Sequence, residues 1–180
     1  GRQIDLMQDR TGGPVRIRTD LDVPVLVVLA ETDVLSPRLW YLPARQPDVG
    51  LLRTWEIAGT AHADLWQIGD FESFLGGHDP VNRGQQGYVV RAALRRLEEW
   101  VREGTPPPGA PPLEVGGGPE PAFLTDEVGN VRGGVRTPVV DAAVQVHSGM
   151  AAPDAPPLVL LFGRTLPADP AVLAARYADR

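Results

Sequence analysis

Two residues that follow apolar segments have the chemistry of an acid and base pair. Asp33 lies in ETDVLSP (31–37), directly after the apolar run VPVLVVLA (23–30), and His62 lies in GTAHAD (59–64). A carboxylate bonded to one imidazole nitrogen fixes the tautomer of a histidine and stabilises its protonated form. The other nitrogen can then take a proton from a nucleophile, because the pKa of His lies near neutrality. We therefore take Asp33 and His62 as candidate catalytic residues.

The segments before these two residues predict neighbouring strands. Residues 25–29 form a continuous run of Val and Leu, which is typical of a central strand in a parallel sheet covered by helices on both sides. Residues 51–59 alternate, so Trp55 and Ile57 should share one face. In an open α/β sheet, loops at the carboxyl ends of the strands line the crevice where ligands bind. If the strands are parallel and adjacent, about 5 Å apart, the carboxylate and the imidazole can meet there.

A crossover and a long helix complete the predicted core. Three prolines between the strands limit the crossover to a short helix over 37–42 and a loop. Apolar residues at the 3.6-residue period predict a helix over 86–104 that covers the sheet, with Gly104 as its C-terminal stop. The predicted apolar stripe consists of Val90, Ala93, Leu94, Leu97, Trp100 and Val101.

The composition changes after this helix. Residues 105–121 are rich in Pro and Gly, which predicts a surface linker without regular structure. Beyond the linker, residues 122–125 and 131–135 predict a hairpin around a turn at 129–130. The segment GGVRTP (133–138) either belongs to this hairpin or forms a flap over the site.

Both ends of the sequence indicate a fragment. The chain begins with Gly1 rather than Met. Near the other end, Asp169 as an N-cap and Pro170 at the first helical position predict a helix that stops after little more than two turns.

Several motifs together resemble a known family. VPVLVVLAETDVLSP is similar to the acid-bearing strand and loop of α/β-hydrolases, and WEIAGTAHAD is similar to their last core strand and histidine loop. The order of RIRTDLDVPVLVVLAETDVL, RQPD, WEIAGTAHAD and GGVRTPVVD resembles the alpha/beta hydrolase domain-containing proteins, which are serine esterase-like enzymes with this C-terminal extension. The resemblance spans roughly residues 15–180.

The resemblance implies a role for each candidate residue. Asp33 matches the acid of a catalytic triad and His62 its base, while Glu31 is the alternate acid. The G-x-S-x-G nucleophile elbow of the family is missing, and in this fold the elbow precedes the acid and the histidine. We therefore expect the nucleophilic serine upstream of Gly1, so that the 180 residues alone would be inactive. Trp66 and Phe71, which follow the histidine loop, are weaker candidates for contact with substrate.

The expected architecture is α/β, the C-terminal part of an α/β-hydrolase fold. Residues 1–104 would carry the acid and histidine loops on parallel strands with covering helices, residues 105–121 would be the linker, and residues 122–180 would form an extension with a hairpin. The implied reaction is hydrolysis of a small-molecule carboxylic ester, without a cofactor. Amidase, lactonase or acyltransferase activity would use the same constellation, and a non-catalytic interaction module on the same fold is the alternative from a different class.

Other interpretations of the same residues remain open. Asp33 could cap a turn or helix, since Asp before Ser-Pro is common at helix starts. His62 and Asp64 form an H-x-D pair, which could be half of a metal site, although the sequence has no second ligand cluster and we predict no metal. His147 and Ser148 are predicted to lie in a surface loop.

Composition excludes several classes of partner. The net charge is −6 and all 17 basic residues are Arg, which disfavours binding to nucleic acid or an anionic membrane. The sequence has no Cys, so it has no disulfide framework and no thiol nucleophile. No apolar run approaches the roughly 18 residues that span a bilayer. Neither the compartment nor the oligomeric state follows from these features.

Overall fold

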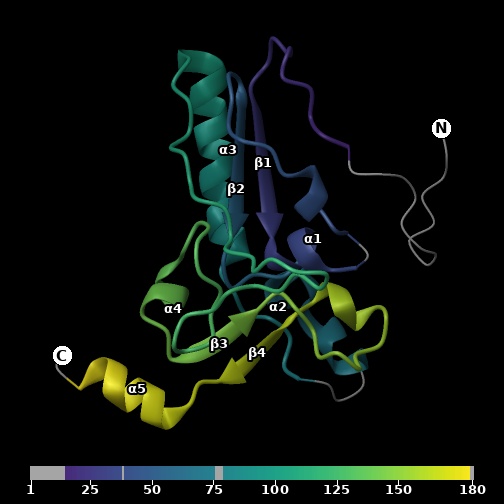
Figure 1. Ribbon diagram of the computed structural model, residues 1–180, viewed down its shortest axis with the longest axis vertical. Helices are drawn as coiled ribbons and strands as arrows, with labels where there is room; N and C mark the ends of the chain where they lie inside the picture. The colour runs from purple at the N-terminus through teal and green to yellow at the C-terminus, as the bar shows by residue number, and fades with distance from the viewer. Residues whose placement is uncertain (1–14, 38, 76–78, 179–180) are drawn as a thin grey trace.

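A parallel pair of strands lies at the centre of the computed structural model, which describes residues 15–37, 39–75 and 79–178. Strand β1 (Val25–Ala30) pairs with β2 (Leu52–Ile57), from Val25 opposite Leu52 to Ala30 opposite Ile57. The parallel and adjacent arrangement predicted from the sequence is thus confirmed. Because the last residues of the two strands are partners, the loops that follow leave the sheet at the same edge (Figure 1).

Helix α3 (Gln86–Glu103) covers one face of this sheet (Figure 1). Trp55 and Ile57 share one face of the strand, as predicted, and they pack against Val89 and Ala93 of this helix. The helix ends at Gly104, whose φ of 72° is the left-handed conformation that favours glycine.

The buried stripe of α3 differs from the predicted one. Val89, Ala93 and Trp100 are buried, whereas Leu94 and Val101 are each 63% exposed. Among the described residues, the sheet that α3 covers has two strands. Leu94 and Val101 lie about 100° around the helix axis from the buried Ala93 and Trp100, and they remain at the surface.

The crossover between the strands also differs from prediction. Helix α1 (Glu31–Leu35) begins directly after β1, and a 3₁₀ turn, η1 (Leu42–Ala44), follows later. The prediction of a short helix over 37–42 was therefore wrong. Ser36 has an extended ψ of 134°, as expected for a residue before proline, so Pro37 ends α1 and does not begin a helix.

Strand β1 is less buried than its composition predicts. Residues 25–29 are half-buried, and only Ala30 is fully buried. Among the residues that the structure describes, β1 pairs with β2 alone, so one edge of the strand has no neighbour there.

The region of the predicted hairpin forms antiparallel bridges without strands of their own. Thr125 pairs with Val131 across a turn in which the Asp126 carboxylate accepts three backbone N–H bonds. The GGVRTP segment lies along β2: Val135 N donates to Glu56 O at 2.7 Å, and Ala58 N donates to Val135 O at 3.0 Å.

The Pro/Gly-rich segment 105–121 has no helix, but it packs against the core at Leu113. This residue is 1% exposed and pairs with Gly133. Its buried neighbours are Val34, Leu35, Ala58, Val131 and Val140. The segment therefore contributes a core side chain in addition to connecting two regions.

The remaining elements gather beyond the carboxyl ends of β1 and β2, in the lower half of Figure 1. They are α2 (Leu65–Ile68), η2 (Gly69–Phe74), α4 (Pro138–Asp141), β3 (Gln145–Ser148), η3 (Val159–Leu161), β4 (Arg164–Pro167) and α5 (Pro170–Tyr177). Strands β3 and β4 pair antiparallel. Helix α5 begins as predicted, with Asp169 Oδ1 accepting from Ala171 N at 2.8 Å. No helix in the described ranges is long and apolar enough to cross a membrane.

We expect Leu113→Ala to lower the free energy of unfolding by about 2–5 kcal/mol, because it leaves a cavity in the core. Leu158→Ala is the matched control, since Leu158 is 53% exposed, and it should change stability by less than about 0.5 kcal/mol. Chemical denaturation measures both. Equal effects of the two substitutions would contradict the packing of residues 105–121 onto the core.

Candidate functional site

The side chains of Asp33 and His62 meet at the carboxyl ends of the strands. Asp33 Oδ1 lies 2.7 Å from His62 Nδ1. The other carboxylate oxygen, Oδ2, accepts from Ala30 N at 2.7 Å and so caps the first turn of α1. The cap that Asp33 provides differs from the one suggested by the sequence, because it belongs to the start of α1 and not to a helix beginning at Ser36 and Pro37. The helix cap holds the carboxylate in the orientation that reaches the imidazole.

The contact with Asp33 changes the proton affinity of His62. The hydrogen bond from the imidazole to the carboxylate raises the pKa of His62 above its ordinary value, and partial burial opposes this effect. The side chain of His62 is 48% exposed, whereas that of Asp33 is 17% exposed. Since Nδ1 faces Asp33, Nε2 is the ring nitrogen that can exchange a proton with a reactant.

Glu31 is directed away from this pair and into the interior. Its side chain is fully buried, and its two oxygens accept from Gly59 N at 2.6 Å and Gly149 N at 2.7 Å. Burial raises the pKa of Glu31 to about 8, although the two amides and the charge of Arg136 favour the ionised form. The carboxylate that contacts the His62 ring is thus that of Asp33.

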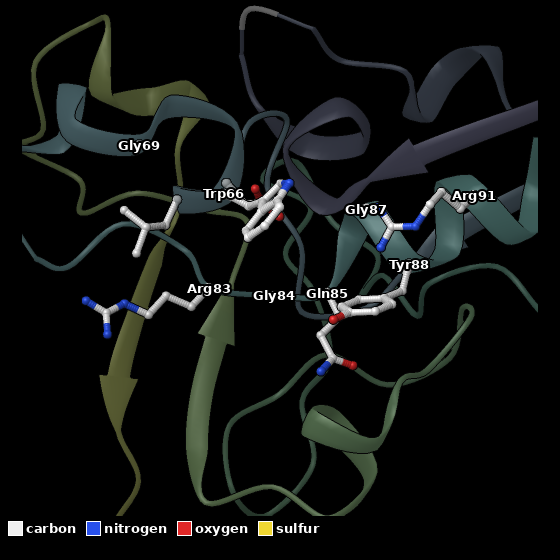
Figure 2. Close-up of a pocket in the computed structure, with 10 residues that line it drawn as sticks. Trp66, Gly69, Arg83, Gly84, Gln85, Gly87, Tyr88 and Arg91 are labelled. Carbon is white, nitrogen blue, oxygen red and sulfur yellow. The ribbon is translucent and has the colours of Figure 1, made fainter.

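A pocket of about 470 Å³ opens beside the histidine loop (Figure 2). It is lined by Asp64, Leu65, Trp66, Gly69, Arg83, Gly84, Gln85, Gly87, Tyr88 and Arg91. Trp66 is 86% exposed and Tyr88 is 66% exposed, so neither ring is part of the core. The Arg91 guanidinium lies over the Tyr88 ring, 4.8 Å from its centre.

Of the two aromatic residues that the sequence suggested, only Trp66 lines this pocket. Phe71 instead packs against Phe74 and Phe162, with ring centres 6.0 and 6.5 Å away. Sequence reasoning did not find Tyr88 and Arg91. Their spacing of three residues at the start of α3 was the available signal, because it places both on one side of the helix.

Comparison with known proteins places the chain in a family. The family model described as alpha/beta hydrolase domain matches residues 1–180. The chain belongs to this family. Its members are generally hydrolytic enzymes, so the domain is of hydrolase type. No curated protein and no solved structure matches the sequence.

The three serines of this alpha/beta hydrolase domain lie outside any G-x-S-x-G motif. Ser73 Oγ donates to Asp70 O at 2.8 Å, and Ser148 Oγ donates to Met150 O at 3.2 Å. Ser36 follows α1 and is 1% exposed. None of them stands at the sharp strand-to-helix turn that exposes the nucleophile in an elbow.

The other polar residues near the histidine loop have structural contacts. Asp64 is 3% exposed and caps α2, where its carboxylate accepts from Gln67 N at 3.1 Å. In the described part of the hydrolase domain, no group of three or more His, Asp or Glu residues could hold a metal ion.

The prediction of a surface loop at His147 and Ser148 was wrong. His147 lies in β3, opposite Thr165 of β4, and is 4% exposed. Its main-chain N–H donates to the buried Asn130 side chain at 2.8 Å, and its ring nitrogen Nδ1 lies 3.3 Å from Thr165 Oγ1. Burial lowers the pKa of this imidazole.

The buried Glu31 predicts a pH dependence of stability. Its folded-state pKa of about 8 exceeds the ordinary value of 4.5, so the folded chain holds a proton that the unfolded chain releases. Its contribution to stability is therefore present below pH 4.5 and is lost as the pH rises toward 8. We expect unfolding by urea to show that Glu31→Gln loses less stability than wild type over this range, by up to about 1.4 kcal/mol per pH unit.

The comparison with Glu31→Gln measures this group once any difference in the His62 titration between the two proteins, followed by NMR, is subtracted. Parallel stability curves for wild type and variant would show that Glu31 keeps an ordinary pKa in the folded state.

Proposed function

We propose that this domain supplies the acid and the base of a carboxylic ester hydrolase, and that the nucleophile is a serine outside the 180 residues. The observation that carries the proposal is the 2.7 Å contact between Asp33 Oδ1 and His62 Nδ1 at the carboxyl edge of the sheet. A partly buried, hydrogen-bonded carboxylate against a half-exposed imidazole is the arrangement that an acyl-transfer enzyme requires of its orienting acid and its base. The family membership supports hydrolysis as the reaction class.

The proposed reaction proceeds through an acyl-enzyme. His62 Nε2 takes the proton of the serine hydroxyl as its oxygen bonds to the ester carbonyl carbon, and Asp33 stabilises the resulting imidazolium. The carbon–oxygen bond to the alcohol then breaks, and His62 gives its proton to the leaving oxygen. In the second half, His62 deprotonates a water that attacks the acyl carbon, the bond to serine breaks, and the proton returns to the serine oxygen.

The pocket beside the histidine loop is the proposed place for part of the substrate. Asp64, which lines it, is two residues from His62, so the backbone at this part of the pocket wall lies within about 8 Å of the histidine backbone. Its volume of about 470 Å³ falls in the range of small-molecule sites. The exposed rings of Trp66 and Tyr88 offer apolar surface for an acyl or alcohol group. A panel of ester, amide and lactone substrates with the complete protein distinguishes the reactions that share this machinery.

In the complete protein, we expect Asp33→Asn and His62→Ala each to lower kcat/KM for ester hydrolysis by about 10³-fold or more. An amide at position 33 cannot stabilise the imidazolium, so the acidic limb of the pH profile should also move to lower pH in Asp33→Asn. This shift follows from the raised pKa of wild-type His62. Steady-state kinetics across pH measures both effects.

Asp70→Asn is the matched control, since it makes the same chemical change at an exposed position on η2. Its activity should equal that of wild type. Wild-type activity in His62→Ala would remove the proposed mechanism.

We expect Trp66→Ala to raise KM several-fold with a smaller change in kcat, because the ring binds substrate away from the reacting bond. Phe74→Ala removes an aromatic ring that is 78% exposed but lies outside the pocket, and it should leave KM unchanged. If both variants behave alike, the pocket does not receive the substrate.

A further inference from the structure

The main chain of His62 is held by a hydroxyl that also contacts the C-terminal extension. His62 N donates to Thr32 Oγ1 at 3.1 Å, and Thr32 Oγ1 donates to the carbonyl of Gly149 at 2.5 Å. A hydroxyl can donate one hydrogen bond and accept others, so the Thr32 hydroxyl accepts from His62 and donates to Gly149. Thr32 is fully buried, so water cannot replace either bond.

A second connection runs through the neighbouring residue. Glu31 accepts from Gly149 N with one oxygen and from Gly59 N with the other. The N–H of Gly149 thus donates to Glu31, and the carbonyl of Gly149 accepts from Thr32. Gly59 begins the loop that carries His62, so the extension is tied to both the acid-bearing helix and the histidine loop.

The fit at Gly149 is too close for any side chain. A Cβ there would lie 2.2 Å from Thr60 O, 2.5 Å from Glu31 Cβ and 2.9 Å from Thr32 N. Side chains do not tolerate such contacts with backbone atoms. The close approach of the two backbones therefore requires glycine at this position.

Other residues of the extension hold the same loop. Ala63 N donates to Leu161 O at 3.1 Å, directly after His62. The buried Asn82 side chain donates to Gly59 O at 3.1 Å and to Ser148 O at 3.0 Å. The loop is thus bonded directly to the extension after the histidine, and it is connected to the extension before the histidine through the Asn82 side chain.

We propose that Thr32 and Gly149 are positioning residues for His62, so that the C-terminal extension is a working part of the catalytic centre. This proposal rests on the proposed function for its kinetic consequence. Its geometric consequence is independent of that function: without the Thr32 hydroxyl, the N–H of His62 loses its acceptor, and the remaining bonds of the loop at Gly59 and Ala63 do not keep the imidazole aligned with Asp33.

The test compares Thr32→Val, which keeps the shape and removes the hydroxyl, with Thr32→Ser, which keeps the hydroxyl. In the complete protein, Thr32→Val should lower kcat about 10-fold or more with KM little changed, because misalignment of the base affects the chemical step. NMR titration of the His62 imidazole should show a pKa below that of wild type. Thr32→Ser should keep kcat within about twofold of wild type, and it should leave the His62 pKa at the wild-type value.

Each outcome decides the proposal. A Thr32→Val variant with unchanged kcat and unchanged His62 titration would overturn it, as would a loss of activity matched by a loss of folded protein with the His62 titration intact. If Thr32→Val does not fold, Glu31→Gln probes the other connection and should also lower the His62 pKa; an unchanged titration there overturns the proposal. Absence of ester hydrolysis in wild type would contradict the proposed function alone, because the titration still reports the alignment.

Discussion

The register of β1 against β2 is the constraint on which the site depends. Ala30 and Ile57 are partners at the ends of parallel strands, so α1 and the loop after β2 leave the sheet together. A slip of one residue would move one loop by about 3.3 Å and turn its strand's side chains to the opposite face. The 2.7 Å contact between Asp33 and His62 would not survive such a change. The apolar packing of Trp55 and Ile57 against α3 fixes this register and thereby the geometry of the pair.

The short helix α1 separates two carboxylates that are close in sequence. Glu31 and Asp33 are two residues apart, which on a helix turns their side chains about 200° from each other. The Glu31 carboxylate therefore enters the interior and accepts hydrogen bonds from two backbone amides. The Asp33 carboxylate caps the helix and faces the imidazole. The environments of the two carboxylates differ accordingly. Glu31 is fully buried, whereas the side chain of Asp33 is 17% exposed and faces the half-exposed His62. A longer loop in place of α1 would not separate them so sharply.

The sequence predicted those features that a local pattern or a general rule of topology determines. Continuous apolar or periodic patterns predicted the strands, α3 and its glycine stop. The rule that loops at the carboxyl ends of parallel strands share one edge predicted the contact between Asp33 and His62. The contacts of Gly149 had no such signal, since Glu31 lies 118 residues away from it. Burial of Leu113 and His147 also depends on partners distant in the chain, and composition alone suggested a linker and a surface loop there. The pocket residues Tyr88 and Arg91 lie on the exposed side of α3, and apolar periodicity predicts only which residues of a helix are buried.

The contact between Glu31 and Gly149 also affects the order in which the site can form during protein synthesis. Residues 31–62, which contain the acid and the histidine, leave the ribosome well before residue 149 does. Until then the buried hydroxyl of Thr32 and one oxygen of Glu31 lack their partners, and the histidine loop lacks its connection to the extension. Closing a contact of such long range is slow relative to local folding. A nascent chain would therefore hold both members of the pair, but their stable alignment would wait until residue 149 had been translated and could pack against Glu31 and Thr32.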